Sequence, residues 1–396
     1  MITVVGVDGG PLPAAALTAL QNASLVVGGA RHLAAVPVPE RAQRVVMGDV
    51  EGALDDVERH PGAAVVLASG DPGFFGVVRR MRERQLRFTV LPAVSSVARA
   101  FARAGLPWDD AVVVSAHGRD LRPAANACRA RPKVAVLTAP GAGPAELAEE
   151  LGGPAPVRRT FLVAECLGSA DERVTEVPAA RAVERSWADP NVVLALATAA
   201  EEARRGWVFP RSSRGSWALD EAEFDHRDGM VTKSEVRALA LPRLAPALGR
   251  MVWDIGAGSG SVGIECARLG SAVVAVERDG QQCARVRSNA QRHGVDIPVV
   301  QGAAPAALAG LPAPDAVFVG GGGLPAVEGA AASGADTLVV ALAALDRFAG
   351  VKRLMSDKGY AVDGTLVSTS RLTALPDGSS RLAATNPVLL VTGSRS

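Results

Sequence analysis

Short apolar runs alternate along the chain with stretches in which apolar residues recur every three or four positions. The first pattern predicts strands buried on both faces, and the second predicts helices that cover them. In the first half, strands are predicted at residues 2–7, 24–27, 63–68, 88–91, 111–114, 133–137, 160–163 and 191–196. In the second half, they are predicted at residues 251–254, 272–276, 298–300, 315–319 and 337–341. Such alternation is typical of α/β folds with parallel sheets.

The end of the chain departs from this alternation. Residues 360–369 and 381–392 both have strand patterns, and no helical stretch joins them. An antiparallel pair is therefore predicted there. Together with the five preceding strands, this pair gives the second half a mostly parallel sheet of seven strands.

The pattern fails between residues 201 and 228, where mixed charges, proline and glycine replace periodic apolar positions. A chain of 396 residues is also too long for one core. We therefore expect two domains, residues 1–205 and 215–396, with a linker between them. Within the first domain, two α/β lobes are expected to meet near Trp108.

The stretch from Met251 to Gly263 predicts a nucleotide-binding turn between a strand and a helix. Its strand runs into Asp254, and glycines follow at 256, 258 and 260 before an apolar-periodic helix. Glycine permits positive φ and close approach of a ligand, and the helix N-terminus offers unpaired N–H groups. Glu277, at the end of the next strand, is placed to accept hydrogen bonds from ribose hydroxyls.

Two cofactors fit this turn, because residues 258–263 also satisfy the Gly-x-Gly-x-x-Gly dinucleotide fingerprint. A pyrophosphate would be repelled by the carboxylate of Asp254, whereas the sulfonium and amino groups of S-adenosylmethionine would be attracted. The acidic residue favours S-adenosylmethionine over a nicotinamide dinucleotide. Glu277 would serve either cofactor.

Glycine-rich loops also follow several strands of the first half. They are residues 6–11, 28–32 and 69–76, and a hydroxyl-bearing turn, Ser95-Ser96, follows the fourth strand. Ligands bind at the carboxyl ends of strands in open α/β sheets, so these loops are a candidate site. In the second half, Thr232 and Glu235 have the spacing of a capping box at a helix start.

Composition removes several classes of function. The net charge is +1, with 42 basic and 41 acidic residues, so no nucleic-acid partner is indicated. No apolar run is long enough for a membrane span, and no signal peptide is predicted, so a cytoplasmic protein is expected. The four cysteines and five histidines show neither Cys-x-x-Cys nor His-x-x-x-His spacing, so neither disulfides nor a metal site are expected.

Both halves resemble known families. Residues 229–237, 253–261, 302–305 and 319–323 resemble the decarboxylating methyltransferase domain of cobalamin biosynthesis. Residues 28–33, 68–76 and 94–96 resemble the tetrapyrrole methylases. In this order the halves resemble fused precorrin methyltransferases of the precorrin-6B step. The resemblance implies a two-lobed tetrapyrrole methylase fold followed by a Rossmann-like domain. It also implies methylation of carbons 5 and 15 of a precorrin and decarboxylation of its carbon-12 acetate.

The resemblance further implies one S-adenosylmethionine site per domain. In the second domain, the cofactor-binding residues expected are Thr232, Asp254, Gly256, Ala257, Gly258, Ser259, Gly260, Glu277, Ala303 and Ala304. In the first domain, they are Gly9, Gly10, Ser69, Gly70, Asp71, Phe74, Ser95 and Ser96. The loop at Asp8, Gly9 and Gly10 is one residue shorter than the family pattern. No metal and no catalytic residue is predicted.

A precorrin carries many carboxylates, so cations are expected around the mouth of each site. The substrate-binding candidates are Lys233, Arg237, Gly321, Gly322 and Arg31. His32 and His117 are expected to form ordinary hydrogen bonds.

Transfer from a sulfonium needs alignment and desolvation rather than an activated side chain. The alternatives are a nicotinamide-dependent oxidoreductase and a non-catalytic tetrapyrrole-binding module. A homo-oligomer is expected.

Overall fold

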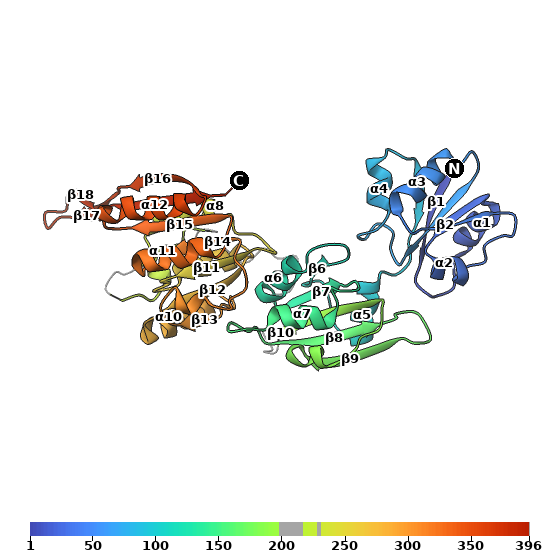
Figure 1. The fold of residues 1–396 in the computed structure, drawn as a ribbon, viewed down its shortest axis with the longest axis horizontal. Helices are drawn as coiled ribbons and strands as arrows, with labels where there is room; N and C mark the ends of the chain where they lie inside the picture. Colours follow the sequence, from blue (N-terminus) through green and yellow to red (C-terminus); the bar gives the residue numbers. More distant parts are fainter. Residues whose placement is uncertain (198–216, 228–230, 396) are drawn as a thin grey trace.

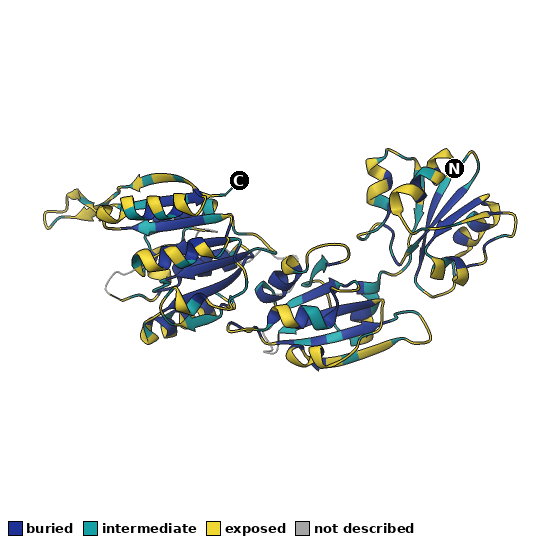
Figure 2. Cartoon of the chain, viewed as in Figure 1, coloured by how far each residue is buried: buried dark blue, intermediate teal, exposed yellow. Residues whose placement is uncertain are grey.

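Three α/β bodies follow one another in a computed structural model of the chain, which describes residues 1–197, 217–227 and 231–395 (Figure 1). Their strands are largely buried, and the outer faces of the helices are exposed (Figure 2). The α/β class predicted from the apolar pattern is confirmed. Most of the expected linker lies outside the described residues.

The first lobe is a parallel sheet of five strands in the order β3-β2-β4-β1-β5. Its strands are β1 (Ile2–Val7), β2 (Leu25–Gly28), β3 (Gln43–Val46), β4 (Ala64–Ser69) and β5 (Phe88–Leu91). Its helices are α1 (Ala14–Asn22), α2 (Ala30–Ala35), α3 (Val50–Arg59) and α4 (Val78–Glu83). The apolar pattern missed β3, because this edge strand is short and largely exposed.

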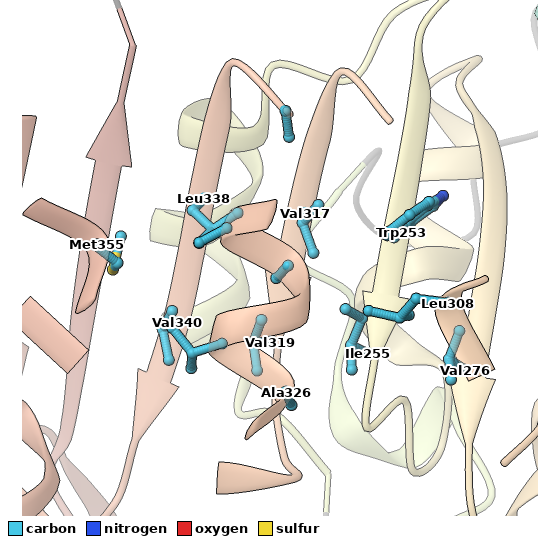
Figure 3. Packing of buried hydrophobic residues seen from close by; sticks show 14 of the residues in the cluster. Trp253, Ile255, Val276, Leu308, Val317, Val319, Ala326, Leu338, Val340 and Met355 are labelled. Carbon is cyan, nitrogen blue, oxygen red and sulfur yellow. The ribbon is translucent and has the colours of Figure 1, made fainter. Parts of the chain in front are cut away.

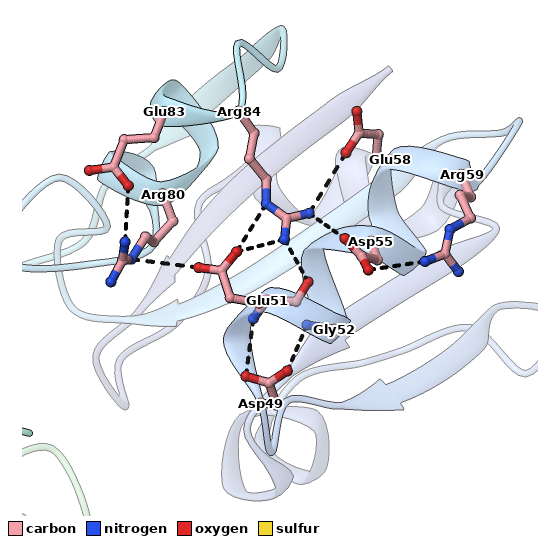
Figure 4. Close-up of polar contacts among 9 residues, drawn as sticks. All are labelled: Asp49, Glu51, Gly52, Asp55, Glu58, Arg59, Arg80, Glu83 and Arg84. Atoms are coloured by element: carbon pink, nitrogen blue, oxygen red, sulfur yellow. Dashed lines mark hydrogen bonds and ion pairs between the residues drawn. The ribbon is translucent and has the colours of Figure 1, made fainter.

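An ion-pair cluster on the first lobe joins α3 to the end of α4 (Figure 4). Arg84 Nη2 lies 2.6 Å from Glu51 Oε2, and its Nη1 lies 2.5 Å from Asp55 Oδ1. Asp49 caps α3 by accepting from Gly52 N at 2.8 Å. The carboxylates of this cluster are half exposed and already paired, so it stabilises the lobe rather than forming a site.

The second lobe has a mixed sheet in the order β6-β7-β10-β8-β9. Its strands are β6 (Val112–Ser115), β7 (Lys133–Leu137), β8 (Arg159–Glu165), β9 (Arg173–Pro178) and β10 (Asn191–Ala197). Its helices are α5 (Ser96–Ala104), α6 (Arg122–Ala130), α7 (Pro144–Leu151) and the 3₁₀ helix η1 (Ala179–Glu184). Only β6 and β7 pair in parallel, and the pattern missed β9, whose side chains are mostly exposed.

The two lobes meet earlier in the chain than the predicted position near Trp108. Helix α5 already belongs to the second lobe, because Phe101 and its apolar neighbours on α5 pack against Ala135 and Leu194. The chain therefore crosses between lobes at residues 92–95. The turn before Trp108 ends α5 at Gly105, which has φ +66°, and does not mark a boundary between lobes.

The C-terminal body has a seven-stranded sheet in the order β13-β12-β11-β14-β15-β19-β16. The strands are β11 (Met251–Ile255), β12 (Ala272–Glu277), β13 (Val299–Gln301), β14 (Ala316–Val319), β15 (Thr337–Leu342), β16 (Ala361–Val367) and β19 (Val388–Ser394). Five strands are parallel, and β19 is antiparallel to both neighbours, as predicted. The expected single strand at 381–392 is wrong: it is broken near Pro387, and β17 (Ser370–Ala374) and β18 (Ser380–Ala384) form a separate hairpin.

Helices cover both faces of this sheet. They are α8 (Ser234–Leu244), α9 (Ser261–Arg268), α10 (Gly280–Arg292), α11 (Gly323–Ala332) and α12 (Phe348–Asp357), with 3₁₀ helices η2 (Glu221–Glu223), η3 (Ala306–Leu308) and η4 (Leu345–Arg347). On one face, Trp253, Val317 and Leu338 pack against Ala326 and Met355 from α11 and α12 (Figure 3). This packing brings the carboxyl ends of the parallel strands to one edge. No helix in the described ranges has the length and apolarity to cross a membrane.

Candidate functional site

The glycine loop after β11 adopts the predicted conformation. Gly256, Gly258 and Gly260 have φ of +67°, +56° and +76°. A Cβ on Gly256 would lie 2.7 Å from backbone atoms of Gly321, so the loops after β11 and β14 touch through glycine. Apart from its chain neighbours, no residue in the described ranges has an atom within 4 Å of the position of a Cβ on Gly258. The backbone at Gly258 is therefore open to a ligand.

Two carboxyl groups flank this loop. Glu277 Oε2 accepts from Gly258 N at 2.9 Å, and its Oε1 accepts from Asp279 N at 3.0 Å. Asp254 Oδ2 accepts from Gly263 N at 2.9 Å. Burial raises the pKa of Asp254 to about 7, although the Gly263 hydrogen bond opposes this shift, and the charge of Glu277 adds to it. Asp254 is thus partly protonated at neutral pH, which weakens the argument that it repels a pyrophosphate.

A cavity of about 1090 Å³ opens at the carboxyl ends of the strands. It brings together Thr232, Lys233, Asp254, Gly256, Ala257, Gly258, Ser259, Glu277, Ala303, Ala304, Gly321 and Gly322. Gly260 is not among the lining residues, and its α-carbon instead faces Val286 on α10. Cavities for drug-sized ligands have volumes of roughly 300–1,000 Å³, so this one has room for a cofactor and part of a larger substrate.

The cavity is lined by charges of both signs. The acidic Asp254 and Glu277 lie at the glycine loop, and Lys233 and Arg347 lie on other loops of the same cavity. The lining also includes Arg227, Arg278 and Asp279. Sequence reasoning missed Arg347, although it follows β15 at the carboxyl edge, where a site was expected. It also missed Asn386, which the broken tail strand brings to the cavity.

Arg237 corrects a prediction, because its guanidinium does not reach the cavity. Its side chain is fully buried, and its Nε lies 2.8 Å from Glu265 Oε1. Its other two nitrogens donate to the carbonyl oxygens of Thr232 and Leu219, and its guanidinium stacks on Phe224. Every donor group is engaged by protein, so Arg237 holds the Thr232 segment in place and does not bind substrate.

The capping box predicted at Thr232 is also wrong. Helix α8 begins at Ser234 with Lys233 at the N-cap, and no side chain of that residue caps it. Instead, Ser234 N donates to Glu221 Oε1 at 2.8 Å. Glu235 is drawn away from the helix terminus by Arg371, at 3.0 Å. A distant carboxylate therefore replaces the local cap.

In the first half, the loops after β1, β4 and β5 meet. Gly70, with φ +56°, donates from its N–H to Val7 O at 2.8 Å and accepts from Ala93 N at 3.3 Å. A Cβ on Gly6 would lie 2.1 Å from Gly70 O, so only glycine fits there. Gly9 has φ +84°, and a Cβ placed on it would lie equally close to the carbonyl oxygen of Gly168 in the second lobe. The shortened first loop thus reaches the boundary between lobes.

The other predicted residues of the first half lie around these loops. Ser95 caps α5 by accepting from Ala98 N at 3.1 Å, with Ser96 as the first residue of that helix. Asp71 Oδ1 accepts from Gly73 N at 2.8 Å. Phe74 packs into the second-lobe core. Gly10 is exposed, and its N–H donates to Asp8 Oδ1 at 3.0 Å.

Arg31, His32 and Ser69 form a polar cluster beside the loop after β4. Arg31 Nη2 donates to Ser69 Oγ at 2.7 Å, and His32 Nε2 lies 3.1 Å from the same oxygen. Burial, together with the charge of Arg31, lowers the pKa of His32 to about 4. His32 is therefore neutral and hydrogen-bonded, as expected, and the cluster keeps one positive charge. His117, the other histidine considered, is exposed.

A mostly parallel sheet that ends in an antiparallel strand pair, with a glycine loop after β11 and an acid at the end of β12, defines a Rossmann-like S-adenosylmethionine-dependent methyltransferase. Residues 222–376 match the family model described as a precorrin methyltransferase domain. Residues 1–183 match the model of the tetrapyrrole (corrin/porphyrin) methylases.

A curated relative from Sinorhizobium sp, named precorrin-6Y C(5,15)-methyltransferase [decarboxylating], is 41% identical over 340 residues, which cover 81% of this chain and 78% of the relative. The chain belongs to this family of two-domain precorrin methyltransferases.

Shorter relatives match parts of the chain. The cobalt-precorrin-7 C(5)-methyltransferase of Salmonella typhimurium is 35% identical over 45% of this chain and 90% of its own length. A probable cobalt-precorrin-6B C(15)-methyltransferase (decarboxylating) from Methanothermobacter thermautotrophicus is 30% identical over 40% of this chain and 86% of its own length. Each shorter relative therefore matches less than half of this chain.

Proposed function

We propose that this chain uses S-adenosylmethionine to methylate carbons 5 and 15 of a precorrin and to remove the carbon-12 acetate carboxyl as carbon dioxide. The observation that carries the proposal is the large carboxyl-edge cavity, which combines an open glycine loop and Glu277 with Lys233 and Arg347. The substrate is a precorrin of the 6B type, although the relatives matched over 78% and 81% of their own length are named for precorrin-6Y.

The residues of the C-terminal cavity fit S-adenosylmethionine, which supplies an electrophilic methyl group when bound. The open backbone at Gly258 allows close approach, and Glu277 is positioned to accept from ribose hydroxyls in exchange for its present backbone partners. Ionised Asp254 favours a cationic cofactor.

The substrate side of the cavity fits a polycarboxylate macrocycle. Among the described residues, neither Lys233 nor Arg347 forms a side-chain hydrogen bond or ion pair, although the charge of Lys233 helps to lower the pKa of Glu221. Both side chains can therefore donate to substrate carboxylates. Backbone at Gly321 and Gly322 permits a flat ring to approach closely. Electrons released by loss of carbon dioxide pass into the conjugated macrocycle, so no side chain has to accept them. A proton taken up from water then completes the methyl group left on carbon 12.

A second S-adenosylmethionine site is proposed in the first half, at the loops that carry Gly9, Gly70, Asp71 and Ser95. Arg31 is the cation proposed to meet a substrate carboxylate there. With domains at 1–205 and 215–396, the first methylates carbon 5, and the second methylates carbon 15 and decarboxylates. The separate C(5) and C(15) relatives support this division, because each is close to one domain in length.

We also propose that the protein forms a homo-oligomer. Leu372 and Leu382 are directly paired on the hairpin of β17 and β18 and are 75% and 68% exposed, which supports a homo-oligomer that covers them. Sedimentation of the purified chain tests this assembly. A cytoplasmic location is proposed as well, and cell fractionation tests it.

The activity is tested by incubating the purified chain with methyl-labelled S-adenosylmethionine and candidate precorrins. The expected product carries two labelled methyl groups and has lost one carbon dioxide. Turnover with a nicotinamide cofactor in place of S-adenosylmethionine would favour the oxidoreductase instead. Tight precorrin binding without turnover would favour a non-catalytic module.

A further inference from the structure

Two segments of the second lobe contact the C-terminal body: helix α6 and residues 153–159 (Figure 1). On α6, Asn126 is buried, and its Nδ2 donates to Gly249 O at 3.1 Å. Arg122 Nη2 lies 3.1 Å from Asp315 Oδ1, and Asp315 Oδ2 accepts from Met251 N at 2.6 Å. These polar contacts join α6 to the segments that lead into β11 and β14.

An apolar contact lies beside these polar ones. Ala155 is 3% exposed and belongs to the same buried cluster as Trp253 and Leu308 of the C-terminal body. A Cβ on Gly153 would lie 3.3 Å from Gly310 O. The second lobe therefore contributes a residue to the core of the other domain, which is unusual for domains joined only by a linker.

Two glycines of the C-terminal body allow the surfaces to fit. Gly249, with φ +86°, lies against Pro123, and a Cβ there would be 3.4 Å from the proline ring. Gly270, with φ +107°, lies against Arg131, and a Cβ would be 3.2 Å from its Nη2. Both conformations are strained for other residues. Glycine at these two positions therefore allows the backbone of the C-terminal body to adopt the conformation that fits against the second lobe.

The contact lies at the edge of the sheet opposite the cavity. Gly249, Gly270 and Asp315 all precede parallel strands, whereas the cavity is lined by the loops that follow those strands. Strand β11 has five residues and so spans about 17 Å at roughly 3.3 Å per residue. The loops of the candidate site in the first half are not among these contact residues either. Neither site opens onto the contact.

We infer that α6 and residues 153–159 form a permanent interface with the C-terminal domain, and that the macrocycle moves between the two active sites through solvent. The interface holds the two domains together even when the chain between them is cut. The second statement rests on the proposed function, but the first does not. Buried Asn126 and Ala155 would be exposed if the domains separated, which disfavours separation.

The interface is tested on the full chain with a protease site inserted between Arg205 and Gly215. After purification, the folded chain is cut, and its sedimentation at micromolar concentration is compared with that of the uncut chain. The two pieces are expected to sediment together with the mass of the uncut particle. Separation into two folded pieces, each with native circular dichroism, would overturn the interface.

Charge reversal identifies the surface involved. Arg122→Glu places two acids together at Asp315, and in the cut chain it should weaken association about tenfold or more. Asn126→Asp should have the same effect, because its carboxylate would face the carbonyl oxygen of Gly249. Arg119→Glu is the matched control, since Arg119 is exposed near α6 and has no such partner in the part of the chain that the structure describes. Equal dissociation constants for all three variants and the parent would overturn the assignment of this surface.

Passage through solvent is tested by isotope dilution with the uncut chain. Labelled substrate is converted in the presence of an unlabelled pool of the singly methylated, decarboxylated intermediate. The label in the final product should fall in proportion to the added pool. Undiluted label would show direct transfer and overturn this statement. Absence of all turnover would contradict the proposed function instead, while sedimentation still decides the interface.

Discussion

Glu277 is the side chain on which we expect cofactor binding in the C-terminal domain to depend most. It ends β12, is nearly buried, and accepts hydrogen bonds from the glycine loop. Glu277→Ala should weaken S-adenosylmethionine binding to this domain by roughly 1.5–3 kcal/mol, the scale for hydrogen bonds to a charged group. Calorimetry measures the change. Unchanged affinity, or tight binding of NADH by the parent chain, would contradict the cofactor assignment.

We expect Asp254 to make this binding depend on pH. Its pKa in the folded chain is about 7, against 3.8 for an ordinary aspartate, so it ionises as the pH rises from 6 to 8. The negative form attracts a sulfonium, and affinity should therefore increase by up to about tenfold across this range. Asp254→Asn should remove that part of the increase. Calorimetry of both proteins at pH 6 and pH 8 tests it, and equal pH dependence would contradict the role of Asp254.

The raised pKa of Asp254 also predicts how the contribution of this residue to folding stability changes with pH. Because the folded pKa lies above the unfolded value, the stability that Asp254 contributes is fully present below about pH 4 and is lost as the pH rises through 7. We expect bound S-adenosylmethionine to offset this loss at neutral pH, because its positive charge would stabilise the ionised form of Asp254.

Arg347 is predicted to hold a carboxylate of the macrocycle. Arg347→Ala should raise the KM for the precorrin about tenfold and leave cofactor affinity unchanged, because it removes a charged hydrogen bond distant from the glycine loop. Lys352→Ala is a suitable control, since Lys352 is exposed on α12 and does not line the cavity. Steady-state kinetics provides the comparison. Equal KM for the two variants would remove Arg347 from the site.

Residue types alone predicted the glycines and acids of the cavity but not the roles of its arginines. The glycines follow from backbone geometry, which local sequence determines. Arg237 and Arg347 look equally available in sequence, yet one is fully buried against Glu265 and the other lines the cavity. That difference depends on the distant segments that pack around each residue.

At the scale of elements, the hairpin of β17 and β18 connects two walls of the cavity. Its base contributes Thr385 to the lining, and Arg371 on β17 forms two hydrogen bonds to Glu221, at 2.6 and 2.9 Å. Glu221 in turn caps α8, next to Lys233. The hairpin therefore fixes the distance between its own base and the start of α8.

Arg371→Ala should loosen this connection. We expect a loss of about 1 kcal/mol in the free energy of unfolding, with a raised KM for the precorrin. The hydrogen bonds from Arg371 hold the pKa of Glu221 at about 2, so their contribution is present above pH 4.5 and is lost as the pH falls towards 2. Arg381→Ala, on the paired strand, is the control. Denaturant unfolding at pH 7 and pH 3 tests this, and identical behaviour of both variants would contradict it.

Element-level patterns predicted every parallel strand of the C-terminal sheet, because buried strands are continuous apolar runs. They failed for β3, β9 and the hairpin, whose side chains are largely exposed and lack a periodic signal. They also failed at α8, where the expected local cap is replaced by Glu221 from another segment.

For the whole molecule, the failure of periodicity from residue 201 onward predicts a division into two domains, and the resemblance of each half to a different family predicts their order. The contact between them could not, because Asn126, Ala155 and Gly249 have no special spacing in sequence and meet only after both sheets have formed. The two cofactor sites are nevertheless expected to act independently, since each is built from loops of its own sheet.

Mass spectrometry of the products of the full chain and of Asp71→Ala tests the central claim, that two separate sites perform different steps. The parent chain, supplied with S-adenosylmethionine and a precorrin of the 6B type, should give a product with two added methyl groups and one carbon dioxide lost. Asp71→Ala, which alters only the loop after β4, should still decarboxylate and add the carbon-15 methyl but should lose the carbon-5 methyl. Loss of decarboxylation together with both methylations in a folded Asp71→Ala protein would contradict this account.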